Sequence, residues 1–120
     1  MRNEAKILIY LNNNGFKWAP RLYYSGYYRC QFYINATQLI TGKHKELEEM
    51  STPEKNELKM AIQALHSLHI VHGDLYPKNI IFGDNHEMFI IDYGLSKICD
   101  KKITWKHEKS DFVQQLFKNK

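Results

Sequence analysis

Residues 72–94 constrain the fold of this chain more than any other stretch, because they carry three oxygen-bearing side chains at defined positions. Asp74 is followed five residues later by Asn79, and Asp92 closes a short apolar run further along. The intervening segment 83–87 is rich in Gly, Asp and Asn, which favour turns, and apolar residues flank it on both sides. The sequence therefore predicts a strand-turn-strand hairpin that returns Asp92 to the side of Asn79.

This spacing of side chains is typical of magnesium-dependent phosphoryl transfer. The chemistry needs one carboxylate to receive or orient the proton of the attacking hydroxyl, and Asp74 is the candidate. It also needs oxygen ligands that hold Mg²⁺ against the phosphates of a nucleotide, and Asn79 and Asp92 are the candidates. ATP and Mg²⁺ are the cofactors that this interpretation requires.

The same stretch resembles two motifs of the protein-kinase-like superfamily. HGDLYPKN over residues 72–79 resembles H-R-D-L-x-x-x-N with glycine in place of arginine, and IIDYGLS over residues 90–96 resembles the strand that ends in D-F-G. The H-G-D spelling is similar to that of compact atypical kinases, including the RIO type and the kinase of the KEOPS tRNA-modification complex, and to that of aminoglycoside and choline kinases. The resemblance implies a protein-kinase-like fold.

Kinase-like domains are usually about twice as long as this chain of 120 residues, so we expect one truncated, partial domain over residues 1–120. The predicted fold class is α+β. Residues 1–36 would form an incomplete N-terminal lobe, and residues 37–120 a shortened, mainly helical C-terminal lobe with the catalytic loop. The resemblance places Glu4 where a helix glutamate pairs with a strand lysine at the nucleotide. No such lysine and no glycine-rich loop precede Glu4, so we expect an incomplete nucleotide clamp and reduced activity.

Hydrophobic periodicity predicts the remaining elements. An apolar stripe and the cap signal Ser51-Thr52-Pro53-Glu54 identify the clearest helix. Near the N-terminus the periodicity favours a helix, although the β-branched Ile7 and Ile9 leave a strand open. The predicted elements are a helix over 2–11, strands over 21–25 and 28–34 joined across Gly26, a short helix or loop over 43–50, a helix over 53–69, and a final helix over 108–117.

Three further residues have roles implied by the resemblance. Lys78 matches the arginine of the variant pattern D-L-x-x-R-N and would neutralise charge on the moving phosphoryl group; the alternative is a solvent-facing lysine. Asp111 resembles a helix aspartate that anchors the catalytic-loop backbone, and the alternative is an acid favoured by the helix dipole. His72 is expected to pack under the loop. A zinc site with His66 and His69 is not expected, because no fourth ligand has a matching spacing.

Composition narrows the class of protein. Hydrophobic residues make up 43% of the chain, which indicates a globular domain. No apolar run approaches the roughly 20 residues needed to span a bilayer, and no signal-peptide core follows Met1, so we expect a soluble, intracellular (cytoplasmic) protein without membrane contact. Cys30 and Cys99 form no C-x-x-C motif, which indicates neither a disulfide framework nor a zinc site.

Charge and aromatic content leave one further alternative. The net charge of +4 and the lysine-rich last third are typical of a solvated face more often than of an acidic-partner site. The tyrosines between residues 23 and 33 are interpreted as strand packing, with base stacking as the alternative, so a nucleic-acid partner is not expected.

Three functions from different classes fit the sequence. The first is a protein serine/threonine kinase of compact atypical type acting on a protein substrate. The second is a catalytically degenerate kinase lobe that acts as a binding or regulatory module on a partner kinase. The third is a kinase of small-molecule hydroxyl groups. Asp74, Asn79 and Asp92 do not by themselves choose the acceptor.

Overall fold

The longest element is helix α2 (Thr52–Ser67), and its start follows from its sequence. Ser51 accepts a hydrogen bond from the amide of Glu54, whose side chain accepts one from the amide of Ser51, so the two residues form a capping box. The buried face of α2 consists of apolar residues three or four positions apart, namely Leu58, Ala61, Ile62 and Leu65. The predicted helix is confirmed. It begins one residue earlier and ends two residues earlier than expected.

The computed structural model describes residues 3–28 and 32–118, and the fold is α+β. The elements in chain order are α1 (Asn3–Asn13), β1 (Leu22–Tyr28), β2 (Phe32–Thr37), α2, β3 (Ile70–Val71), β4 (Ile80–Phe82), β5 (Met88–Ile90), β6 (Lys97–Ile98) and α3 (Asp111–Lys118), with 3₁₀ turns at Leu47–Glu49, Pro77–Asn79 and Trp105–His107. The strands pair antiparallel as β1–β2, β3–β6 and β4–β5. Within the described ranges, no helix has the length and apolar character needed to cross a bilayer.

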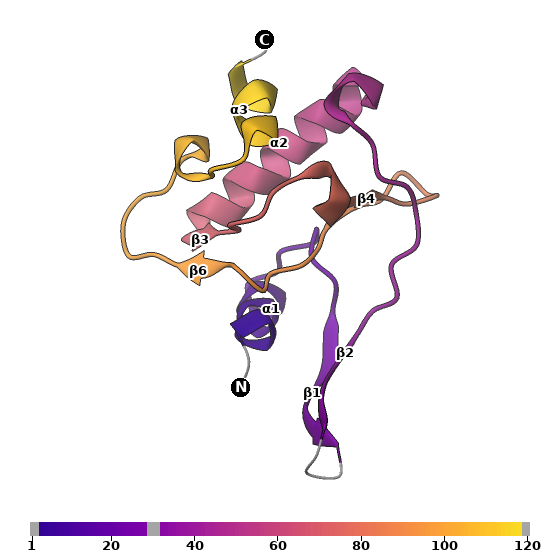
Figure 1. The fold of residues 1–120 in the computed structure, drawn as a ribbon, viewed down its shortest axis with the longest axis vertical. Helices are drawn as coiled ribbons and strands as arrows, with labels where there is room; N and C mark the ends of the chain where they lie inside the picture. Colours follow the sequence, from indigo (N-terminus) through magenta and orange to yellow (C-terminus); the bar gives the residue numbers. More distant parts are fainter. Residues whose placement is uncertain (1–2, 29–31, 119–120) are drawn as a thin grey trace.

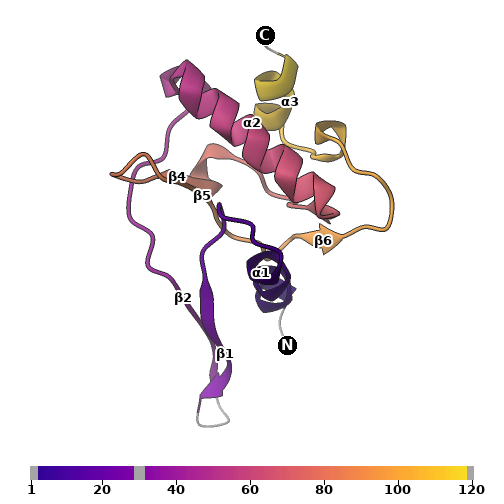
Figure 2. The ribbon, with the colours of Figure 1, turned by 180° about the vertical axis from the view of Figure 1, so that it is seen from behind.

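The arrangement of these elements is visible in Figure 1. Helices α2 and α3 lie at the C-terminal end of the molecule, and the β1–β2 hairpin projects from the opposite end. The reverse view in Figure 2 shows the same order, with α1 next to β6. The N-terminal helix therefore lies beside a strand formed by residues near the end of the chain.

Helix α1 confirms the helical prediction for the N-terminal segment over the strand alternative. Its buried residues are Ala5, Ile7, Leu8 and Leu11. The helix ends as the sequence indicates, because Gly15 adopts a left-handed backbone with φ 72°. The amide of Phe16 then donates to the carbonyl of Leu11 at 3.0 Å.

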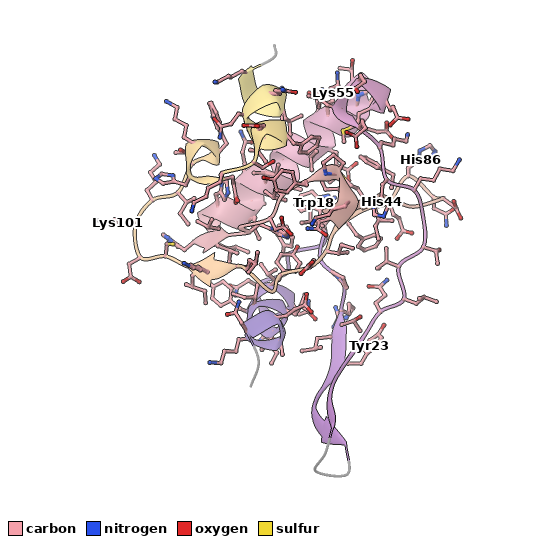
Figure 3. The ribbon with its side chains drawn as sticks, in the orientation of Figure 1. Trp18, Tyr23, His44, Lys55, His86 and Lys101 are labelled. Atoms are coloured by element: carbon pink, nitrogen blue, oxygen red, sulfur yellow. The ribbon has the colours of Figure 1, made fainter. Side chains whose placement is uncertain are left out.

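The β1–β2 pair confirms the predicted hairpin but not the position of its turn. Gly26 pairs with Ile34 inside the ladder, and pairing continues to Tyr28 and Phe32. The prediction that the chain turns at Gly26 was wrong, because glycine can occupy a strand position as well as a turn. Figure 3 places Tyr23 on the outside of this hairpin, where 68% of its surface is exposed.

The final helix begins at Asp111 and not at residue 108 as predicted. The carbonyl of Ser110 accepts from the amide of Gln114, and the Ser110 hydroxyl accepts from the amide of Val113. Ser110 therefore caps α3, which leaves Glu108 outside the helix. Only α2 and α3 are α-helices in the described part of residues 37–120, so this region is less helical than predicted.

Two segments attach the β4–β5 hairpin to the rest of the molecule. The first is Trp18, which follows α1 and lies centrally in Figure 3. Its carbonyl accepts a hydrogen bond of 2.7 Å from the amide of Ile90, and its indole donates to Glu57 of α2 at 3.0 Å. On the other edge, Lys43 exchanges two backbone hydrogen bonds with Phe82. The hairpin that leads to Asp92 is thereby fixed on both sides.

Candidate active site

The segment after β3 brings three of the predicted site residues together. Asn79 ends the 3₁₀ turn Pro77–Asn79 and is only 4% exposed. Its side-chain amide donates to the backbone carbonyl of Asp74 at 2.8 Å and to Oδ2 of Asp74 at 3.0 Å. Lys78 lies on the same turn, and its ammonium is 3.6 Å from the same Asp74 oxygen, although 69% of its side chain is exposed. The loop formed by residues 72–79 thus holds the Asp74 carboxylate through Oδ2.

The β4–β5 hairpin delivers Asp92 to this loop, which confirms the predicted strand-turn-strand unit. The amide of Ile91 donates to the carbonyl of Asn79 at 2.9 Å, so the residue before Asp92 is bonded to the loop. Asp92 itself has a left-handed backbone with φ 61°, which few residues other than glycine adopt. Asn79 and Asp92 are therefore adjacent through the backbone.

The chemistry of these side chains fits a magnesium ion. Both N–H contacts of the Asn79 amide go to Asp74, and no described residue donates to its Oδ1. Within residues 3–28 and 32–118, the Asp92 carboxylate receives only a long contact of 3.4 Å, from the amide of Gly94 to Oδ1. Carboxylate and amide oxygens without strong internal partners are the ligands that Mg²⁺ takes in proteins, so Asn79 and Asp92 would hold it.

His72 is fully buried beneath the loop, as predicted. Its Nε2 is 2.8 Å from the carbonyl of Ile91, and its Nδ1 accepts from the amide of Asp74 at 3.1 Å. These partners require the neutral tautomer with the proton on Nε2. Burial lowers the pKa of His72, while the bond to the Ile91 carbonyl and nearby carboxylates partly oppose that shift. His72 thus links the Asp74 segment to the strand that precedes Asp92.

Glu108 anchors the backbone of the loop, a role that the sequence analysis did not predict. The amide of His72 donates to its Oε2 at 3.0 Å, and the amide of Gly73 donates to its Oε1 at 3.1 Å. His66 of α2 lies 2.8 Å from Oε2, and both side chains of that pair are almost fully buried. Burial by itself raises the pKa of Glu108, but the hydrogen bonds from His66, His72 and Gly73 outweigh it and lower the pKa below 4.5.

Asp111, which the resemblance placed in this anchoring role, does not perform it. Asp111 is exposed in the first turn of α3, where an acid interacts favourably with the helix dipole. The alternative interpretation of Asp111 is therefore the correct one. Glu108 takes the backbone contacts because it precedes the Ser110 cap and so faces α2 and the loop.

The glycine of the H-G-D sequence has a structural reason. Gly73 has φ 90°, and a Cβ at this position would lie 2.5 Å from the carbonyl oxygen of Leu95. The hydroxyl of Ser96 donates to the carbonyl of His72 at 2.8 Å, which holds the two segments this close. An arginine at position 73 would meet both the backbone strain and the contact with Leu95.

Gly73→Ala is therefore expected to destabilise the fold more than Gly15→Ala. Gly15 also has a positive φ, 72°, but a Cβ there meets nothing within 4 Å. Gly15→Ala should lose about 1–2 kcal/mol from the left-handed backbone alone. Gly73→Ala should lose the same amount plus about 1–3 kcal/mol for displacing Leu95. Urea unfolding of both variants measures the difference, and equal losses would show that the contact with Leu95 costs nothing.

Glu4 lies at the site but with a partner that was not predicted. Its Oε2 accepts a hydrogen bond of 2.8 Å from the amide of Tyr93, the residue after Asp92. Among the described residues, no lysine forms an ion pair with Glu4. Helix α1 therefore contacts the Asp92 segment directly.

Tyr93 is fully buried, and its ring packs edge-to-face on His72 with centroids 4.9 Å apart. Its hydroxyl has no hydrogen-bond partner among the described residues. Burial raises the pKa of Tyr93 well above 10, and the nearby Glu4 carboxylate adds to the shift. Tyr93 is thus a neutral buried phenol whose hydroxyl no described residue satisfies.

Tyr93→Phe is expected to stabilise the protein by about 1–3 kcal/mol, because it removes a buried donor that lacks a partner. Tyr10→Phe is the matched control with the opposite sign. The hydroxyl of Tyr10 donates to the carbonyl of Leu68 at 2.9 Å, so its loss should destabilise by about 0.5–1.5 kcal/mol. Chemical denaturation of both variants tests the pair, and a destabilised Tyr93→Phe would contradict the prediction.

A cavity of about 350 Å³ opens beside Asp92. It is lined by the carboxylates of Glu4 and Asp92 and by the apolar side chains of Leu8, Leu39, Ile81 and Ile91, among others. This size lies within the range of about 300–1,000 Å³ typical of ligand sites. A larger cavity of about 640 Å³ adjoins the β4–β5 turn and contains none of the site residues. The smaller cavity is therefore the candidate nucleotide pocket.

Two other residues considered in the sequence, His69 and Cys99, take no part in this site. His69 has φ 66° and contacts the carbonyl of Lys101 at 3.4 Å. Figure 3 places Lys101 on a loop at the edge of the molecule. Cys99 is a free, half-buried thiol, and Cys30 lies outside the described residues. No cluster of three or more His, Cys, Asp or Glu within residues 3–28 and 32–118 has the arrangement of a metal site.

Several known proteins similar to this chain are kinases or kinase-like. A family model for the lipopolysaccharide kinase (Kdo/WaaP) family matches residues 16–119. The chain is 31% identical over 96 residues to a probable inactive serine/threonine-protein kinase of Dictyostelium discoideum, which covers 72% of this chain and 8% of that protein. It is 34% identical over 89 residues to the serine/threonine-protein kinase greatwall of Xenopus laevis, which covers 68% of this chain and 10% of that protein.

A third relative, the probable serine/threonine protein kinase IRE4 of Arabidopsis thaliana, is 34% identical over 103 residues, with 79% of this chain and 10% of that protein covered. The chain thus spans about a tenth of the length of these relatives. The matched family lies within the predicted superfamily, but it is not the RIO type or the KEOPS kinase named from the H-G-D spelling. Because the match covers nearly the whole sequence, this chain belongs to the lipopolysaccharide kinase (Kdo/WaaP) family of the protein-kinase-like superfamily.

Proposed function

We propose that this chain carries the catalytic segment of an ATP- and Mg²⁺-dependent phosphotransferase that acts on a hydroxyl group. The observation that carries the proposal is the hydrogen-bonded loop in which Asn79 holds Asp74 and accepts the backbone bond that brings Asp92 alongside. Membership of a kinase family supports the use of ATP. Residues 1–36 would then belong to the N-terminal lobe and residues 37–120 to the C-terminal lobe.

In the proposed reaction, Oδ1 of Asp74 accepts the proton of the acceptor hydroxyl. The acceptor oxygen forms its bond to the γ-phosphorus as the bond to the β-phosphate oxygen breaks, and ADP leaves. Bound Mg²⁺ would neutralise charge on the phosphates. Asn79 and Asp92 would supply its oxygen ligands, Lys78 would lie beside the moving phosphoryl group, and the cavity next to Glu4 would take the nucleotide base.

We infer that the acceptor is the hydroxyl of a serine or threonine in a protein. The enzyme would then be a protein kinase of compact atypical type. The names of the relatives support this acceptor. The description of the family supports a sugar hydroxyl instead, which is the small-molecule alternative. Radiolabelled ATP offered with a mixture of proteins and, separately, with sugars distinguishes them, because the label moves only to the correct class.

A second candidate function is a catalytically degenerate module that binds a partner kinase. The observation that favours it is that Oε2 of Glu4 is already engaged by the amide of Tyr93. The Dictyostelium relative, described as a probable inactive kinase, adds support. A chain that binds a complete kinase without any turnover of ATP would support this function over the first.

Calorimetric titration with ATP, with and without Mg²⁺, tests the proposed function. The wild-type chain should bind ATP more tightly when Mg²⁺ is present. Asp92→Asn should weaken the affinity for ATP in the presence of Mg²⁺ by about 10–100-fold, because it removes a charge from the proposed metal site. Its affinity for metal-free ATP should stay the same.

Asp100→Asn is the matched control, since Asp100 is exposed and lies outside the site. It should leave both affinities unchanged. A folded wild-type chain that binds no ATP under either condition would contradict the proposed function. An Asp92→Asn variant with intact metal dependence would contradict only the role of Asp92.

A further inference from the structure

The left-handed conformation of Asp92 requires support from its neighbours. A residue other than glycine with positive φ costs of order 1–3 kcal/mol and persists only where the surrounding structure fixes it. The residue before Asp92 is bonded to the carbonyl of Asn79, and the residue after it is bonded to Glu4. The turn 93–96 that follows must also be held, because movement there would let φ of Asp92 relax.

Asn3 contacts this turn from the first residue of α1. Its side-chain Nδ2 is 2.9 Å from the carbonyl of Ser96, 3.1 Å from that of Gly94 and 3.5 Å from that of Tyr93. All three partners are carbonyl oxygens, so the nitrogen of the amide must face them. One side chain, about ninety positions away in sequence, thus contacts three carbonyl oxygens of the turn.

We infer that Asn3 is a positioning residue that holds the turn 93–96 and thereby keeps Asp92 in its left-handed conformation. This inference rests on the proposed function only in that Asp92 is taken as a metal ligand. Asn3 would touch neither nucleotide nor metal. Its effect on the site passes through Gly94 and Ser96 on one side of Asp92, while Glu4 fixes the amide of Tyr93.

Two substitutions separate this role from an ordinary helix-start role. Asn3→Ala removes the donor. Asn3→Asp has the same shape but presents only acceptor oxygens to the carbonyls, so it should loosen the turn more than Asn3→Ala. A residue that merely starts a helix gives the opposite order, because an acid in the first turn is favoured by the helix dipole. The order of the two variants therefore discriminates between the roles.

Amide hydrogen exchange in the full chain provides the first measurement. The amides of Tyr93 and Ser96 donate to Glu4 and to the carbonyl of Tyr93, so their exchange reports the turn. We expect exchange about 2- to 10-fold faster in Asn3→Ala, corresponding to one lost hydrogen bond, and faster still in Asn3→Asp. Asn13→Ala, at the exposed far end of α1, is the matched control and should change neither amide.

The second measurement is the affinity for Mg²⁺ in the presence of ATP, by calorimetry. Asn3→Ala should weaken it by about 10-fold or more, as loss of a supporting contact behind a metal ligand typically does, with metal-free ATP binding unchanged. Unchanged exchange in both Asn3 variants, or exchange that is slower in Asn3→Asp than in Asn3→Ala, would overturn the inference. A wild-type chain without MgATP binding would count against the proposed function alone, since the exchange result still decides the role of Asn3.

Discussion

Asp74→Asn should lower the rate of phosphoryl transfer by about 10²–10⁴-fold, the contribution typical of a positioned general base. The substitution keeps the shape of the side chain and the oxygen that can accept from Asn79, but an amide cannot take a proton from the acceptor hydroxyl. The affinity for MgATP should change little, because Asp74 is proposed to act on the acceptor. Single-turnover transfer from radiolabelled ATP, measured beside calorimetric binding, separates the two effects.

Asp84→Asn is the control for this experiment. Asp84 is an exposed carboxylate in the turn between β4 and β5, so its neutralisation changes the net charge equally but leaves the loop intact. Its transfer rate should match that of the wild-type chain. Undiminished transfer in Asp74→Asn would refute the assignment of Asp74 as the base, while equal losses in both variants would point to a general effect of charge.

Glu108→Ala should destabilise the fold by about 3–5 kcal/mol, because three buried donors lose their acceptor at about 1–3 kcal/mol each. Glu108 is 1% exposed and accepts from His66 and from the amides of His72 and Gly73. Without it, two backbone amides of the loop and one imidazole lose their acceptor inside the protein. Urea unfolding measures the loss, and a change below about 1 kcal/mol would contradict the role of Glu108.

Asp111→Asn is the control that separates the two acids. Asp111 is exposed at the start of α3, so its neutralisation should cost only about 0.3–1 kcal/mol through the helix dipole. Acid provides a second measurement. Because the pKa of Glu108 is lower in the folded chain than unfolded, its contribution to stability is present above pH 4.5 and is lost as pH falls through the folded pKa. Glu108→Ala should lack this part of the acid dependence.

Local patterns predicted the elements whose signals lie within a few residues. The cap of α2 and its apolar stripe are continuous in the sequence, and so is the turn between β4 and β5. The motif positions Asp74, Asn79 and Asp92 follow from the same short-range logic, because a hairpin of that length returns the chain to the loop. These features needed no knowledge of distant contacts.

The contacts that hold the site together were not predictable in this way. Glu108 meets amides that lie 35 and 36 positions earlier, and among the acids of the last third nothing in the spacing distinguishes it from Asp111. The cap signal of Ser110 was the available clue, since it places Glu108 outside the helix. Likewise, Gly73 was visible as a departure from arginine, but its close contact with Leu95 exists only in the folded chain.

The partners of α1 affect how this chain can fold as it is synthesised. Asn3 and Glu4 bond to residues 93–96, and Tyr10 bonds to Leu68, so the first helix cannot complete its contacts until residues far downstream have left the ribosome. At about 5–20 residues per second, those last partners emerge roughly 5–18 seconds after the helix. During that interval, α1 can pack only against the residues that follow it as far as β1, and the rest of its apolar face stays uncovered.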